Sequence, residues 1–122
     1  MRFAEFTELN TLRCEIWHPG FPNEDWNLAD WSNAMCGEAG EAANVVKKIR
    51  RWESTGKQGA LDAPPAELLD QLADEIGDVY AYLDLLATKA GIDIEKAIVR
   101  KFNRVSIREG WPHLQFMVVK ES

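Results

Sequence analysis

Apolar residues recur at intervals of three and four positions in four stretches of this chain, which is the spacing of one face of an α-helix. Polar and charged residues fill the positions between them, as on the solvent side of an amphipathic helix. No segment shows a convincing β-hairpin pattern. The pattern therefore predicts an all-α protein, with helices over about 2–16, 27–53, 66–90 and 93–108.

Helix-breaking residues separate these stretches. A segment with Pro and Gly at 18–22 should end the first helix, and a loop with a Pro pair should cover 54–65. Gly91 follows the third stretch, and Asp93 is placed to cap the fourth helix. A C-terminal tail covers 113–122, and its segment 114–119 is compatible with a strand or an extended arm. Because such helices bury their apolar faces against one another, we expect a four-helix-bundle-like fold with the two long helices antiparallel.

The composition narrows the class of protein. A chain of 122 residues is the common size of one domain, so we expect a single domain over residues 1–122. The net charge of −6 argues against binding to nucleic acid or to an anionic membrane, because both need a surplus of Lys and Arg. No apolar run approaches the roughly 18–20 residues of a membrane span, and the N-terminus lacks the apolar core of a signal peptide. We expect a cytoplasmic protein.

The cysteines and histidines do not suggest a chemical site. Cys14 and Cys36 lie far apart and form no C-x-x-C pair, so we expect reduced, structural thiols. His18 and His113 are isolated from each other and from any carboxylate pair. We expect both histidines to be solvated or satisfied by neighbours.

Two carboxylates occupy an unexpected place in the second long stretch. At about 100° per residue, Glu38 falls within the apolar stripe that includes Met35 and Val45. Glu41 lies three residues later, at the edge of the same face. An ionised carboxylate is costly to bury alone, so it takes up a proton, pairs with a cation or binds a metal.

The third stretch carries a matching acidic pair. Glu75 borders the apolar stripe, Asp78 follows three residues later, and Tyr82 lies one further turn along. If the two long helices are antiparallel, the four carboxylates converge at one level and repel each other unless divalent cations are present. An all-oxygen ligand set favours Mg²⁺, with Mn²⁺ as a substitute. The predicted ligands are Glu38, Glu41, Glu75 and Asp78.

The residues around these acids resemble the MazG-like all-α nucleotide pyrophosphohydrolases. The resemblance covers about residues 25–112 and is carried by Gly37-Glu38-Ala39-Gly40-Glu41, by Asp74-Glu75-Ile76-Gly77-Asp78 and by Gly91-Ile92-Asp93. It implies hydrolysis of nucleoside triphosphates to the monophosphate and pyrophosphate, often to clear unwanted nucleotides. It also implies a homodimer or homotetramer and a Mg²⁺ site at the four acids. Glu41 and Glu38 are the candidate catalytic residues, with Glu41 as the candidate general base.

The same resemblance suggests residues that contact the substrate. Lys101 and Asn103 correspond to a Lys and an Asn that hold phosphates in the family, and Arg104 is a further candidate. Lys48 stands where deoxycytidine-preferring relatives carry a Trp, so their base preference is not transferred. Tyr82 is a candidate through its place beyond Asp78. Trp31 is read either as a stacking partner for a base or as core packing.

Other interpretations of the acidic pairs stay open at this point. E-x-x-E is common on solvated helix faces, where it marks no site. A carboxylate-bridged di-iron bundle also places Glu on facing helices, but it needs Glu-x-x-His pairs that are absent from this sequence. A non-catalytic nucleotide- or metal-binding helical scaffold would use the acids to hold a structural ion. The acids outside the two pairs, Asp74 among them, are expected to be solvated.

Overall fold

The computed structural model describes residues 1–54 and 64–118. Over these residues the chain is all-helical, with α1 at Phe3–Trp17, α2 at Leu28–Ser54, α3 at Ala66–Lys89 and α4 at Ile94–Arg108. The all-α prediction is confirmed, and each helix begins and ends within one residue of its predicted bounds. Most of the predicted loop at 54–65, and the end of the predicted tail at 119–122, lie outside the described residues.

The part of the predicted tail that the structure describes, up to residue 118, contains no strand. Within the described residues, no helix is both long enough and apolar enough to cross a membrane.

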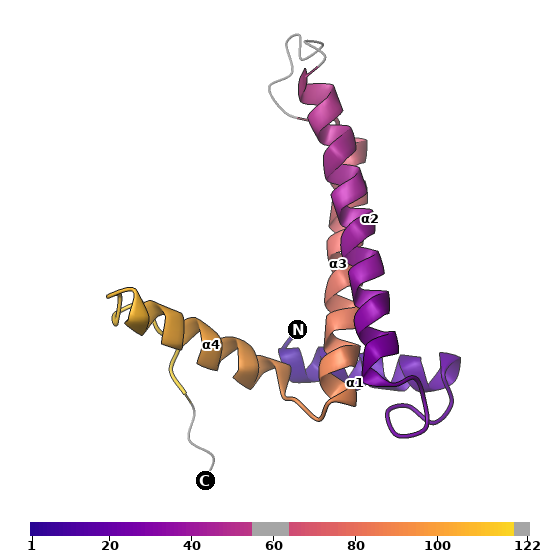
Figure 1. The fold of residues 1–122 in the computed structure, drawn as a ribbon, viewed down its shortest axis with the longest axis vertical. Helices are drawn as coiled ribbons and strands as arrows, with labels where there is room; N and C mark the ends of the chain where they lie inside the picture. The colour runs from indigo at the N-terminus through magenta and orange to yellow at the C-terminus, as the bar shows by residue number, and fades with distance from the viewer. Residues whose placement is uncertain (55–63, 119–122) are drawn as a thin grey trace.

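The two long helices α2 and α3 lie side by side and run in opposite directions (Figure 1). Their buried residues recur at helical spacing, as at Val45 and Ile49 on α2 and at Ala81 and Leu85 on α3. The antiparallel arrangement expected from the sequence is confirmed. It brings the middle of α2 level with the middle of α3, which is where both acidic pairs lie.

α1 crosses the α2–α3 pair near its lower end in Figure 1 and packs on α3. A polar network joins the two helices at Asp84, which is completely buried. Thr7 Oγ1 donates to Asp84 Oδ1 at 2.6 Å, and Asn10 Nδ2 donates to Asp84 Oδ2 at 3.0 Å and to the Ala81 carbonyl oxygen at 2.9 Å. Our sequence interpretation did not identify this network, although Asp84 stands between apolar positions of the α3 stripe.

An aromatic core fills the space where α1, α2 and α3 meet. It contains Cys14, Phe21, Trp31 and Leu85, with Tyr82 partly buried against it. Burial raises the pKa of the Cys14 thiol to about 11, which fits the predicted structural thiol. Cys36 is also unbonded but is exposed on α2.

His18 packs at the edge of the same core. Its ring contacts Trp26 and Trp31, with centroid separations of 4.6 Å and 5.3 Å, and its Nδ1 lies 3.3 Å from Asp25 Oδ1. The expectation of a satisfied histidine is confirmed for His18.

α4 leaves the end of α3 and projects away from the α2–α3 pair (Figure 1). Gly91 adopts a φ of +71°, and the Ile92 N–H donates to the Ala87 carbonyl oxygen at 2.8 Å, which closes α3 with a Schellman-type turn. Asp93 Oδ1 then accepts from the Lys96 N–H at 3.0 Å and caps α4. Both predicted boundary residues are confirmed.

Candidate metal centre

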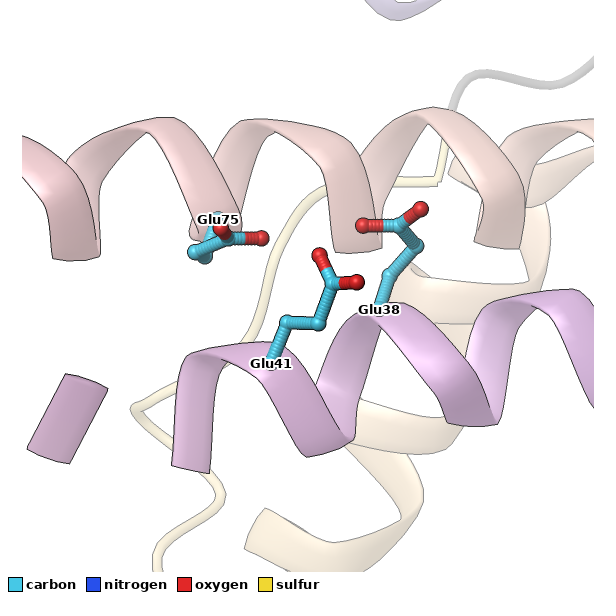
Figure 2. Close-up of side chains that lie close together, drawn as sticks. All are labelled: Glu38, Glu41 and Glu75. Carbon is cyan, nitrogen blue, oxygen red and sulfur yellow. The ribbon is translucent and has the colours of Figure 1, made fainter. Parts of the chain in front are cut away.

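Three carboxylates meet in the space between α2 and α3. Figure 2 shows Glu38 and Glu41 on α2 reaching toward Glu75 on α3. One carboxylate oxygen from each of the three lies within 4.8 Å of the other two. The i, i+3 spacing directs Glu38 and Glu41 to one side of α2, and the antiparallel pairing supplies Glu75. We call Glu38, Glu41 and Glu75 the acidic cluster.

The acidic cluster is held in an environment that disfavours its negative charge. Glu38 Oε2 and Glu75 Oε2 are buried and have no hydrogen-bond partner, whereas Glu41 is exposed. Burial, followed by the charges of Glu41, Asp78 and Glu75, raises the pKa of Glu38. Burial, followed by the charge of Glu41, raises the pKa of Glu75 in the same way. Since carboxylate oxygens are the ligands that Mg²⁺ and Mn²⁺ prefer, the donor set and its orphaned oxygens fit a divalent cation.

Asp78 lies beside the acidic cluster but outside the group of three oxygens within 4.8 Å. Its side chain is exposed. Its charge contributes to the raised pKa values of Glu38, Glu75 and Tyr82. Asp78 is therefore near enough to act on the cluster electrostatically, while its role as a ligand stays a prediction.

An open pocket of about 330 Å³ adjoins one side of the acidic cluster. We call it the polar pocket, and its lining residues are Glu41, Asn44, Val45, Lys48, Gln71, Asp74 and Glu75. The structure thus places Lys48, a predicted substrate contact, beside two of the predicted metal ligands.

Three polar residues of the polar pocket were not among the predicted site residues. Asn44 and Gln71 did not stand out in the sequence, and Asp74 was expected to be an ordinary solvated acid. Asp74 is exposed, but it lines the pocket and its charge contributes to the raised pKa of Glu75. For Asn44 and Gln71 the available signal was their helical spacing from Glu41 and Glu75, because residues three or four apart share one side of a helix. Asp74 directly precedes Glu75 and lies three residues beyond Gln71.

A small cavity of about 20 Å³ lies at the aromatic core. We call it the aromatic cavity, and its lining includes Asn10, Arg13, Trp17, Trp31 and Tyr82. Trp31 is 1% exposed and belongs to the core, so packing is the role that the structure shows for it. The charges of Glu38 and Asp78 contribute, after burial, to a raised pKa of Tyr82. Tyr82 therefore lies between the aromatic cavity and the acidic cluster.

The predicted phosphate contacts on α4 are not brought to the acidic cluster within one chain. Over the described residues, α4 contacts α1 and α3 but not α2. Lys101 and Arg104 are exposed. Asn103 is buried, and its amide exchanges two hydrogen bonds with the Phe116 backbone, at 2.9 Å and 2.8 Å. The Asn103 side chain thus fastens the C-terminal segment to α4, and the substrate contacts of these residues stay predictions.

Comparison with known proteins identifies one similar enzyme. The chain is 33% identical over 70 residues to dCTP pyrophosphatase 1 of Mus musculus. The matched stretch covers 57% of this chain and 38% of the mouse protein, so the chain spans well under half of that relative. No family model and no solved structure matches the chain. Over just more than half its length, then, this chain is similar to an enzyme named for acting on dCTP.

Proposed function

We propose that this protein hydrolyses (deoxy)nucleoside triphosphates to the monophosphate and pyrophosphate, with Mg²⁺ held by the acidic cluster and Asp78. The observation that carries the proposal is the convergence of three carboxylates, two of which have a buried oxygen without a hydrogen-bond partner. The similarity to a dCTP pyrophosphatase supports the substrate class. Clearing unwanted nucleotides from the pool is the biological role that we propose for this reaction.

Glu41 is the residue best placed to handle the proton. It is the exposed member of the acidic cluster and also lines the polar pocket, so water and substrate both have access to it. The acidic cluster and Asp78 would hold the divalent cation, which would offset the charge of the phosphate oxygens and promote ionisation of the attacking water. Glu41 accepts a proton from this water as its oxygen bonds to the α-phosphorus. The bond from the α-phosphorus to the bridging oxygen breaks, and its electron pair leaves with pyrophosphate.

The nucleoside end of the substrate lies on the side of Tyr82. Tyr82 lines the aromatic cavity and lies one turn beyond Asp78 on α3, and Trp17 lines the same cavity while 67% exposed. An aromatic ring that is partly exposed offers a face on which a base stacks. Trp31 packs in the core against Tyr82, so the proposed stacking falls to the more exposed rings of Tyr82 and Trp17.

A second copy of the chain completes the proposed enzyme. Several large apolar side chains of α1 and α4 are exposed in the single chain, including Leu9, Ile16, Phe102 and Ile107. A second copy that covers them removes apolar area from water. We propose a homodimer or homotetramer in which α4 of one copy brings Lys101 and Arg104 to the acidic cluster of another.

Product analysis tests the proposed reaction. The protein is incubated with Mg²⁺ and each canonical or modified (d)NTP, dCTP included, and the products are separated by ion exchange. Monophosphate with pyrophosphate is the expected result, and it should disappear when EDTA replaces Mg²⁺. Diphosphate with orthophosphate would identify another hydrolase, and no product from any nucleotide would favour the non-catalytic scaffold.

A further inference from the structure

We propose that the polar pocket receives the pyrophosphate end of the substrate, with Lys48 as the cation that binds it. The inference rests on the proposed function and adds the direction in which the triphosphate lies along the α2–α3 pair. The leaving pyrophosphate is thereby placed in the polar pocket, and the nucleoside at the opposite end of the acidic cluster, near Tyr82.

The polar pocket offers hydrogen-bond donors that have no protein partner among the described residues, and two of them, on Asn44 and Lys48, are exposed to solvent. The Lys48 ammonium group and the side-chain amides of Asn44 and Gln71 form no hydrogen bond or ion pair with any described residue. Asn44 and Lys48 are four residues apart on α2, and Gln71 faces the same pocket from α3. An ammonium group carries three donors and each amide carries two, which suits the several acceptor oxygens of a pyrophosphate.

The order of side chains along the two helices matches the order of groups in a nucleoside triphosphate. On α3, Tyr82 lies seven residues beyond Glu75, or about 10 Å along the helix axis, while Gln71 lies four residues to the other side, or about 6 Å. The antiparallel α2 repeats this order, since Lys48 follows Glu41 by two turns on the Gln71 side. With the reacting phosphate at the acidic cluster and the nucleoside at Tyr82, pyrophosphate extends toward Gln71 and Lys48.

Charge explains why the pocket should bind pyrophosphate together with Mg²⁺ and not alone. The pocket lining includes the carboxylates of Glu41, Asp74 and Glu75, which repel a bare polyanion. Lys48 is the one cationic residue of that lining. A divalent cation held by the acidic cluster would offset the charge of the carboxylates and leave Lys48 to attract the phosphate oxygens in the pocket. The pocket volume of about 330 Å³ is at the lower end of the range for small-molecule sites, about 300–1,000 Å³.

Calorimetric titration with inorganic pyrophosphate and saturating Mg²⁺ tests this assignment directly. We expect the unaltered chain to bind, Lys48→Ala to weaken binding at least about tenfold, and Lys48→Arg to retain most of the affinity. Lys47→Ala is the matched control, because Lys47 is exposed on the same helix and does not line the pocket. It should change the affinity less than about twofold. Equal affinities for Lys48→Ala and Lys47→Ala, or no binding by the unaltered chain, would overturn the inference.

A separate turnover assay keeps this inference distinct from the proposed function. If the unaltered chain hydrolyses a nucleoside triphosphate but pyrophosphate affinity does not depend on Lys48, the function stands and the pocket assignment is wrong. If no nucleotide is hydrolysed while Mg²⁺ and pyrophosphate still bind through Lys48, the pocket assignment stands and the proposed reaction is wrong.

Discussion

Glu41 differs from the other two carboxylates of the acidic cluster in its exposure to solvent. Glu38 and Glu75 each bury an oxygen that has no hydrogen-bond partner, whereas Glu41 is exposed and borders the polar pocket. This difference leaves Glu41, alone of the three proposed cation ligands of the acidic cluster, open to both solvent and the polar pocket. We expect Glu41→Gln to reduce turnover by at least about 100-fold while nucleotide affinity changes much less.

Steady-state kinetics and binding of a non-hydrolysable nucleotide measure the two effects of Glu41→Gln separately. Asp70→Asn is the matched control, since Asp70 is an exposed acid on α3 that does not line the polar pocket. Its turnover should equal that of the unaltered chain. Unchanged turnover in Glu41→Gln would remove Glu41 from the mechanism.

At the scale of the helices, the Asp84 network fastens α1 to α3. Asp84 is completely buried and accepts hydrogen bonds from Thr7 and Asn10. Asp84→Ala leaves the buried Asn10 amide with one acceptor fewer and the Thr7 hydroxyl without its partner. We expect a loss of about 2–3 kcal/mol in the free energy of unfolding, measured by urea denaturation.

Two further variants locate the origin of that loss. Asp84→Asn keeps one carbonyl acceptor in nearly the same shape and should cost less than Asp84→Ala. Asp70→Ala removes an exposed acid from the same helix and should stay within about 0.5 kcal/mol of the unaltered chain. If Asp84→Ala were as stable as Asp70→Ala, the network would not hold α1 in place.

The α2–α3 pair should show a pH-dependent stability that originates in the acidic cluster. Burial and neighbouring carboxylates raise the pKa of Glu38 and of Glu75 above the ordinary value of 4.5. Between that value and the raised values, the folded chain binds more protons than the unfolded chain. The stability that these two carboxyl groups contribute to the folded state is therefore complete below about pH 4.5. It is lost as the pH rises from 4.5 through their raised pKa values. Without metal, we expect the chain to lose stability, relative to a Glu38→Gln/Glu75→Gln double variant, as the pH rises from 4.5 toward 7.

Urea denaturation in EDTA across this pH range measures the difference, because Gln has nearly the shape of a protonated Glu and does not titrate. Adding Mg²⁺ at pH 7 should stabilise the unaltered chain and leave the double variant unchanged. A stability difference that did not vary with pH would show that the two carboxylates are not destabilised by folding.

At the scale of the whole molecule, the described part of the structure does not bring α4 against α2, the helix that carries Glu38 and Glu41. α4 projects away from the α2–α3 pair, and over the described residues it makes no contact with α2 (Figure 1). We therefore propose that Lys101 and Arg104 serve the acidic cluster of another copy. We expect a homodimer or homotetramer by light scattering, and activity that depends on residues from two chains.

Mixing two inactive variants tests this sharing of the site. Glu38→Gln disables the acidic cluster, and a Lys101→Ala/Arg104→Ala variant disables α4. In a dimer with random exchange, half of the molecules are mixed and each contains one intact site, so about a quarter of the unaltered activity should return. A mixture that exchanges subunits but stays inactive, or a chain that is monomeric at assay concentration, would contradict the shared site.

Local pattern was enough to predict the helices and the three acids that converge, Glu38, Glu41 and Glu75. Glu38 was identified because a carboxylate stood in an apolar stripe, and Gly91 and Asp93 because helix ends leave backbone groups that particular residues satisfy. The buried position of Asp84 was not predicted from the sequence, even though Asp84 is more deeply buried than Glu38. Its partners Thr7 and Asn10 lie more than 70 positions away in the sequence, and helical periodicity carries no information about which distant helix supplies them.

The sequence by itself determined four helices, their ends, and the two acidic pairs on the two long ones, because each of these follows from residues within a few turns of one another. Tertiary structure alone decided which oxygens converge, that Trp31 packs in the core, and that Lys48 shares a pocket with Asn44 and Gln71. It also decided that α4 lies away from the acidic cluster. These outcomes depend on how one helix is placed against another, which is determined by side-chain packing across the whole molecule and not by the period of any single helix.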